Sequence, residues 1–461
     1  MRRSLVSWVF VFTGIFLMMA GMIFGNSVVE KIKDTYGLYS TGKVVVSVTK
    51  EAGANLNNLF TSEDADKLSS ILENGNLTAE AETIALVKSG NISAKADVRG
   101  VNSNYQLFQT VNIIEGSFFT KADEDETDLV AVIDEELALE LFKTTRVIGN
   151  KIEIFGRNFR IAGITGKDKS LLGVITEKEE NTVYVPVNVL LEVDNETRIS
   201  SLQIKNEGSD LLERNESTVS EALKAIGKDP SSYIIEDYYI KEVFMQQKTQ
   251  LAVFIPGIIL IITLAGILKK RIKGLVVMIS TACRTDYFSN VLRIYKARLF
   301  AELTRVLVLT GIIVIVWLGA SYKLFIPQKY IPDELIDFSF YYDLLKDSIL
   351  KGNSMIGYLP PAEEILLNGA QRILDWVFYP ALFAGIPLVY IGFYQLNHER
   401  KDISVLTVSC SVLTVVAVAA VSVAVIAAGM PLSIRLNGLL VLFTFIYINT
   451  IIFSKEREEL F

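Results

Sequence analysis

Long apolar runs divide the chain into apolar and polar parts. Residues 5–25 contain no charged side chain, and at about 1.5 Å per residue they can cross the roughly 30 Å hydrocarbon core of a bilayer. Comparable runs follow at residues 251–268, 303–322, 376–394, 403–428 and 436–453. This pattern predicts a polytopic α-helical membrane protein with about six spans. The first run is longer than the apolar core of a secretory signal, and no small-residue cleavage site follows Gly25, so we expect a retained span.

Basic residues predict how these spans are oriented. They gather in clusters that lie at Arg2 and Arg3, between Lys269 and Arg305, at Arg400 and Lys401, and at Lys455 and Arg457. Cytoplasmic loops of membrane proteins carry an excess of lysine and arginine. If every cluster faces the cytoplasm, six spans alternate without contradiction and both termini lie inside the cell. Residues 26–250 and 326–375 are then outside.

The outer stretch 26–250 has the pattern of a mixed α+β domain. Runs typical of strands occur at residues 43–48, 83–87, 129–133, 151–155, 158–162, 183–186 and 201–204. Helices are expected after the capping residue Ser62 and over residues 135–142. Gly156-Arg157 separates two of the short strands and predicts a tight hairpin, because glycine supplies the positive φ that such a turn requires.

Composition and charge disfavour several kinds of chemistry. The 461 residues include one histidine, His398, and two cysteines, Cys283 and Cys410, which is too few for a multi-histidine metal site, a cysteine-ligated cluster or a disulfide framework. The sequence has no P-loop, so we expect no ATP site in this chain. We expect no other cofactor either. The acidic residues 123–128 favour a solvated loop over a calcium site, because the glycine and terminal glutamate of an EF-hand are missing. Residues 26–250 hold 37 acidic and 24 basic side chains, which disfavours a nucleic-acid surface.

Short motifs within the outer stretch occur in an order that resembles the extracytoplasmic domain of MacB/FtsX-type ABC transporter permeases. These motifs are Gly100–Tyr105, Ile114–Phe119, Val130–Ile133, Leu141–Phe142, Gly149–Ile152, the hairpin Gly156–Gly163 and Thr182–Pro186. Ser117 stands where this family usually has arginine. The resemblance covers the first two thirds of the chain, to about residue 325, and is weaker beyond it.

The resemblance implies a layout of one span, a large two-lobed α+β outer domain on stalk helices, and then the remaining spans. We therefore expect segments that comprise residues 1–25, 26–250, 251–325, 326–375 and 376–461. In order, they are the first span, the outer domain, the second and third spans, an outer loop, and the last three spans with a cytoplasmic tail. Residues 27–36 and 240–250 would be the stalks. The apolar spacing of residues 240–250 predicts a helix continuous with the second span, and the alternative is a helix that lies on the membrane surface.

The cytoplasmic segment 269–302 lies between the second and third spans. Its apolar spacing predicts two amphipathic helices that are joined near residues 284–286. MacB/FtsX-type permeases use a helix at this place to dock on a separate ATPase. The resemblance implies that this contact involves Gly274, Ala282, Arg284 and Asp286. Thr281 and Met278 depart from the family pattern, and the alternative is a pair of ordinary juxtamembrane helices.

Together these features favour a permease subunit of an ABC-type system that is not itself an enzyme. The resemblance implies a separate cytoplasmic ABC ATPase and a second permease chain, which gives a homodimer or a heterodimer in the lipid bilayer. Motion driven by the ATPase would reach the outer domain, for export or for activation of an outer partner. No nucleic acid and no cofactor are expected. The alternative is a membrane-anchored sensor or scaffold without ATPase coupling.

Two features of the spans refine this interpretation. Their interiors contain essentially no ionisable side chains, which argues against an ion-coupled transporter and against an intramembrane enzyme. The resembled family usually has four spans, so the runs 403–428 and 436–453 are interpreted as an added helical hairpin.

Overall fold

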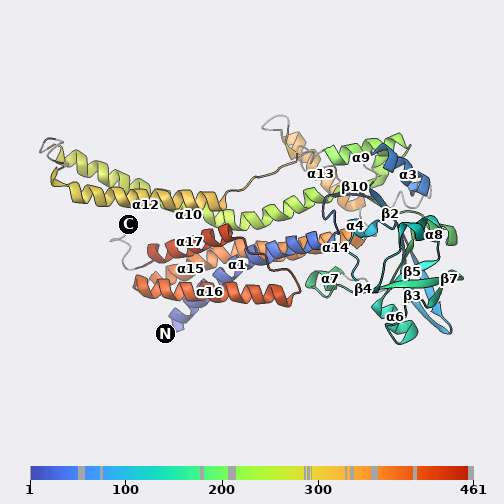
Figure 1. The fold of residues 1–461 in the computed structure, drawn as a ribbon. Helices are drawn as coiled ribbons and strands as arrows, with labels where there is room; N and C mark the ends of the chain where they lie inside the picture. Colours follow the sequence, from blue (N-terminus) through green and yellow to red (C-terminus); the bar gives the residue numbers. More distant parts are fainter. Residues whose placement is uncertain are drawn as a thin grey trace. The chain divides into compact units, whose positions relative to one another are not determined.

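The computed structural model describes residues 2–49, 58–72, 76–176, 181–205, 214–284, 287, 291, 293–327, 330–332, 337–354, 362–397 and 402–454. The chain forms two compact units (Figure 1). The first, here called the helical unit, comprises Met1–Glu30, Met245–Leu324 and Gln371–Phe461. The second, here called the sheet unit, comprises Lys31–Phe244 and Phe325–Ala370.

Apolar helices form the helical unit, wholly or in part. They are α1 (Arg2–Thr35), α10 (Tyr238–Ala282), α12 (Lys296–Ala320), α14 (Ala362–Pro380), α15 (Ile386–Asn397), α16 (Ile403–Ala427) and α17 (Leu436–Ile452). Among the described residues, five helical stretches are long and apolar enough to cross a membrane: Leu5–Thr35, Tyr238–Ala282, Lys296–Ala320, Glu364–Asn397 and Ile403–Ala427. The helix at the sixth predicted span, α17, has only 17 residues. The polytopic helical fold is confirmed, with five long apolar stretches and one short helix.

Small residues let α1 approach the helix that follows α14. A five-residue π-helical turn, η5 (Ala381–Gly385), joins α14 to α15 directly after Pro380, whose ring nitrogen cannot donate to the helix. A Cβ atom built on Gly14 would lie 2.6 Å from the carbonyl oxygen of Gly385. A Cβ on Gly392 of α15 would lie 2.6 Å from Val11. Glycine is therefore required at these positions for the observed backbone separation.

One mixed sheet organises the sheet unit. Its strands are β1 (Lys43–Val48), β2 (Leu77–Ser89), β3 (Ile92–Val101), β4 (Ile113–Gly116), β5 (Val130–Asp134), β6 (Lys151–Ile154), β7 (Arg157–Thr165), β8 (Asn181–Pro186), β9 (Ser201–Lys205) and β10 (Tyr233–Asp237). The strand order is β10-β1-β9-β2-β3-β8-β5-β7-β4, and β6 pairs with β2 and β7. The β3–β8 and β5–β7 pairs are parallel, and the other pairs are antiparallel. The predicted mixed α+β character is confirmed.

Short helices complete the sheet unit. They are α3 (Ser62–Ile71), α4 (Tyr105–Phe108), α5 (Lys121–Asp125), α6 (Glu135–Phe142), α7 (Leu171–Thr176), α8 (Val187–Val193), α9 (Arg214–Ala225), the 3-10 turn η3 (Pro230–Ser232) and α13 (Phe338–Ser354). The main hydrophobic core combines strand residues such as Val46 and Val98 with Leu137 of α6, Leu190 of α8 and Leu223 of α9. Burial of these apolar faces holds the helices on the sheet.

Two local details differ from the sequence predictions. The β6–β7 hairpin turns at Phe155 and Gly156, both with positive φ, so the turn begins one residue earlier than predicted and places Arg157 in β7. Helix α3 is capped by Thr61 rather than Ser62, because the Thr61 hydroxyl accepts the Asp64 N–H and the Asp64 carboxylate accepts the Thr61 N–H.

Candidate functional site

The predicted ATPase-coupling residues fall at the end of a long helical hairpin. Gly274 and Ala282 belong to α10, Arg284 follows it directly, and Asp286 lies outside the described residues. The first of the two helices predicted in this segment is the last part of α10, which continues without a break from the second predicted span to Ala282. Figure 1 shows α10 and α12 running together toward this tip, and the Arg271 guanidinium lies 3.2 Å from the Glu302 carboxylate.

The hairpin tip is exposed over the residues that the structure describes. Val276 and Val277 are 60% and 55% exposed, and a Cβ built on Gly274 would meet no atom within 4 Å. Residues 269–282 extend α10 by roughly 20 Å beyond the predicted span, at about 1.5 Å per residue. This part of the hairpin is long enough to stand clear of the hydrocarbon core and offers an apolar surface.

Within the sheet unit, a buried lysine contacts the end of α1 and the beginning of α10. Lys43 begins β1, and its ammonium donates to the backbone oxygen of Phe108 and to Oε1 of Gln203, each at 2.7 Å. The same ammonium lies 4.3 Å from the ring centre of Tyr36 and 5.7 Å from that of Tyr238. Tyr36 follows α1 and Tyr238 begins α10, so one cation holds both helix ends.

A buried carboxylate reinforces this junction. Glu242 of α10 accepts a hydrogen bond from the Thr41 hydroxyl and lies 3.3 Å from the Lys33 ammonium of α1. The Glu242 side chain is only 5% exposed, whereas that of Lys33 is 31% exposed, so the carboxylate is the shielded partner of the pair. Displacement of either helix within the sheet unit would therefore break charged contacts to the other.

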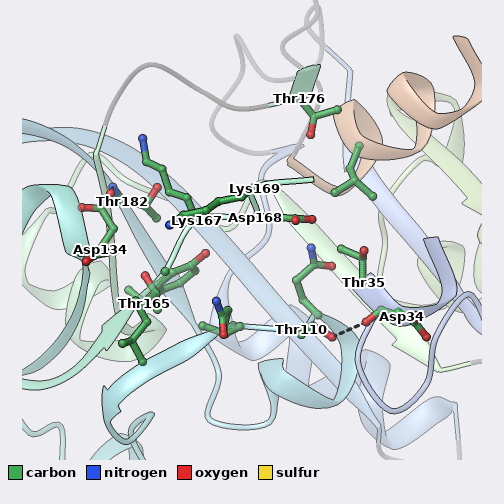
Figure 2. A pocket seen from close by; sticks show the side chains of 18 of the residues that line it. Asp34, Thr35, Thr110, Asp134, Thr165, Lys167, Asp168, Lys169, Thr176 and Thr182 are labelled. Carbon is green, nitrogen blue, oxygen red and sulfur yellow. Dashed lines mark hydrogen bonds between the residues drawn. The ribbon is translucent and has the colours of Figure 1, made fainter. Parts of the chain in front are cut away.

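A cavity of about 730 Å³ lies in the sheet unit (Figure 2). One wall comprises the last turn of α1 with Asp34 and Thr35, together with Thr110. The facing wall comprises Asp134 at the end of β5 and Thr182 in β8. The loop after β7, with Lys167, Asp168 and Lys169, crosses between these walls. Segments distant in the sequence thus supply a polar lining of both charge signs.

Most charged groups of this lining already have partners within the protein. The Arg99 guanidinium makes two 3.0 Å hydrogen bonds to Asp97, and Lys31 lies 2.9 Å from Asp168. Lys167 lies 2.6 Å from Glu136. The cavity is therefore close to electrostatically neutral.

Two carboxylates of this cavity have pKa values that are shifted in opposite directions. Burial raises the pKa of Asp134 above its usual value, although the N–H groups of Leu137 and Thr182 donate to its charged form. Burial alone would also raise the pKa of Asp168, but the Ser170 N–H and the Lys31 ammonium hold it below the usual value. Asp134 is thus a structural cap that joins α6 to β8, and Asp168 is an ion-pair partner.

A metal site is another arrangement that acidic side chains can form. Within the part of the chain that the structure describes, no group of three or more His, Cys, Asp or Glu side chains is placed to hold a metal ion. The acidic residues considered for calcium lie partly in α5, where the Asp123 carboxylate accepts the Thr120 N–H at 2.7 Å.

The sequence offered no signal for the large cavity, because its walls come from strand ends and loops with no shared motif.

Known proteins resemble the chain most clearly over its outer domain. Residues 6–220 match the MacB-like periplasmic core domain family. The pyoverdine export ATP-binding/permease protein PvdT of Pseudomonas aeruginosa is 32% identical over 101 residues, which are 22% of this chain and 15% of the relative. The macrolide export ATP-binding/permease protein MacB of Aggregatibacter actinomycetemcomitans is 22% identical over 270 residues, which are 57% of this chain and 41% of the relative. The chain thus spans less than half the length of these relatives.

Solved structures of domains outside the membrane are also similar to part of the chain. The extracellular domain of the noncanonical ABC-type transporter YknZ from Gram-positive bacteria is 18% identical, and the match covers 42% of this chain and 99% of that domain with a TM-score of 0.35. The periplasmic region of MacB from Actinobacillus actinomycetemcomitans is 18% identical, and the match covers 48% of this chain and 97% of that region with a TM-score of 0.38.

The apolar helices and the matched family together define a class: a multispan membrane protein with a domain outside the membrane. More particularly, residues 6–220 are similar to the MacB-like periplasmic core domain family. The predicted resemblance to MacB-like ABC transporter permeases is confirmed.

Proposed function

We propose that this chain is the permease subunit of an ABC-type system, in which a separate cytoplasmic ATPase moves the membrane helices and thereby the outer domain. One observation carries the proposal. Helix α10 has 45 residues and is continuous from the sheet unit to the exposed hairpin tip. A continuous helix of this length can transmit displacement along its axis, and Pro256 within it removes one backbone hydrogen bond without ending it. The family match of the outer domain supports the same assignment.

The proposed topology places both termini, the tip of the α10–α12 hairpin and the tail after α17 in the cytoplasm. Residues 26–250 and 326–375 are then outside, as the positions of the basic clusters favour. In this arrangement the ends of α1 and α10 near Tyr36 and Tyr238 are the stalks of the outer domain. The Lys43 and Glu242 contacts between them would make the two stalks move as one body.

The proposed contact with the ATPase is the hairpin tip, with Gly274, Ala282, Arg284 and Asp286. The exposed apolar side chains beside Gly274 support this assignment, because a partner could bury them. The permease would act with a second chain, either a copy of itself or a related permease. Motion of the outer domain would export a substrate or activate an outer partner.

Affinity purification of the tagged full-length protein in mild detergent tests this function. We expect an ATPase with a P-loop to co-purify and ATP hydrolysis to accompany it. Replacing Arg284 and Asp286 together by alanine should remove most of the bound ATPase. Arg146→Ala on the surface of the sheet unit is the matched control and should leave it bound. Recovery of an outer-surface partner without any ATPase would instead establish a sensor or scaffold.

A further inference from the structure

A second cavity, of about 420 Å³, lies entirely within the helical unit. Residues of α1, α10, α12 and α17 line it, together with Arg435 just before α17. Asn26 follows the first predicted span, Gln250 precedes the second, and Arg435 precedes the sixth. The cavity therefore lies where the apolar runs end, at the level of lipid headgroups.

A buried amide in this cavity has no hydrogen-bond partner. Asn26 is 3% exposed, and its side-chain nitrogen contacts no acceptor. A buried polar group in this state costs free energy, because its hydrogen bond to water is lost and not replaced. A ligand with an acceptor oxygen would remove this cost.

Positive charge faces the same space. Arg435 lines the cavity, and none of the ion pairs among the described residues involves its guanidinium. Arg435 also occupies the N-cap position of α17, where no side chain caps the helix. The free N–H groups of a first helical turn favour an anion at that position. Among the described residues that line the cavity none is acidic, so no carboxylate in this lining neutralises these donors.

The remaining wall is apolar. Met22 of α1, Val253 of α10 and Ala320 of α12 contribute to it. A free inorganic ion would leave this surface without contacts, whereas a lipid would cover it with its glycerol and upper acyl carbons. The combination of clustered donors with an apolar wall is therefore suited to an anionic amphiphile.

We propose that this cavity binds the phosphate group of an anionic phospholipid, held by Arg435, the Asn26 amide and the N-terminus of α17. Its position in the outer leaflet rests on the proposed topology, whereas the binding itself does not depend on ATPase coupling. The lipid would bridge α1, α10, α12 and α17, and its occupancy would hold these helices together near the point where the chain leaves for the sheet unit.

Native mass spectrometry of the delipidated full-length protein in detergent tests the site. The probes are dioctanoyl phosphatidylglycerol, dioctanoylglycerol, which has the same chains without phosphate, and inorganic phosphate. We expect saturable retention of phosphatidylglycerol only. Arg435→Gln should raise the concentration for half occupancy by roughly tenfold or more, because a charged hydrogen bond is lost. Asn26→Leu, of similar volume, should raise it by a smaller factor.

Arg298→Gln provides the matched control, since Arg298 is an exposed arginine near the other end of α12. It should leave lipid retention unchanged, and size-exclusion profiles should show that all variants remain folded. Equal retention of dioctanoylglycerol, or unchanged affinity in Arg435→Gln, would overturn the proposal. Inorganic phosphate that competes at the same concentration as phosphatidylglycerol would overturn the lipid as the source of the anion. Failure of an ATPase to co-purify would contradict the proposed function. It would not contradict this lipid site, because lipid binding does not depend on ATPase coupling.

Discussion

The two cavities described above both contain charged and polar side chains, but they differ in how the charged groups are paired. In the sheet unit, Arg99 is hydrogen-bonded to Asp97, and Asp134 accepts two backbone N–H groups. In the helical unit, the Asn26 amide is buried without a partner, and Arg435 faces a wall whose described residues include no acid. The charged groups named in the first lining are paired within the protein, although Gln109 Oε1 in the same lining is buried without a hydrogen-bond partner. In the second lining the Arg435 guanidinium has no ion-pair partner among the described residues, and the Asn26 amide is unsatisfied.

The comparison teaches that cavity size and polarity alone do not identify a binding site. The larger cavity, about 730 Å³, has charges that stabilise the fold by pairing with one another. The smaller one, about 420 Å³, leaves donors whose desolvation is uncompensated. Substitutions in the two walls should therefore have opposite effects on stability.

Removing Arg99 should produce the largest effect. Arg99→Met would leave the buried carboxylates of Asp97 and Glu80 without their cation, and the side chains of these residues are 4% and 3% exposed. We expect a loss of about 3–5 kcal/mol in the free energy of unfolding of the sheet unit. Pulse proteolysis of the full chain in increasing urea measures it. Arg146→Met, on the exposed surface, is the control, and an equal effect of both variants would contradict the structural role of Arg99.

A pair of asparagine variants in the helical unit sharpens the contrast. Asn26→Leu removes an unsatisfied amide, so without lipid we expect unchanged stability or a gain of about 1 kcal/mol. Asn449→Leu removes an equally buried amide that donates to the Phe445 carbonyl at 2.8 Å, so we expect a loss of about 1 kcal/mol. Thermal unfolding in detergent compares the two. A greater loss in Asn26→Leu than in Asn449→Leu would show that Asn26 is satisfied in the protein.

The smallest effect is expected at the rim of the larger cavity. Asp168 has a pKa lowered below 3.8 in the folded chain, so its contribution to stability is present above that pH and is lost as the pH falls through the folded value. Its side chain is 37% exposed, so Asp168→Asn should cost less than about 1 kcal/mol near neutral pH. Unfolding midpoints of wild type and variant should converge on acidification, and a constant difference down to pH 2 would exclude this titration as the cause.

Local patterns predicted some elements well because local forces decide them. The β-branched run 43–48 is β1, and residues 135–142 are α6 with the Asp134 carboxylate at its N-cap. Strands β3 and β10 were not predicted, because their polar residues interrupt the apolar alternation. The turn before Arg157 is shifted because Phe155 adopts a positive φ that a sequence pattern assigns to glycine.

The functional regions also differ in how far the sequence alone predicts them. The hairpin residues Gly274, Ala282 and Arg284 could be selected from a continuous motif, and their role stays a prediction. Asn26 and Arg435 come from opposite ends of the chain, and only the packing of α1 beside α17 brings them to one cavity. Whether a buried amide is satisfied depends on neighbours in space, which no spacing along the sequence reports.

The π-helical turn at Ala381–Gly385 has a consequence for how this sequence can be inherited. Such a turn corresponds to one residue inserted into an α-helix. Deleting a residue there would restore regular α-helical winding and leave the residues beyond it on the same face of the helix. Gly392 would then keep its close approach to Val11. The insertion can therefore be gained or lost during evolution without a change in the glycines that face α1.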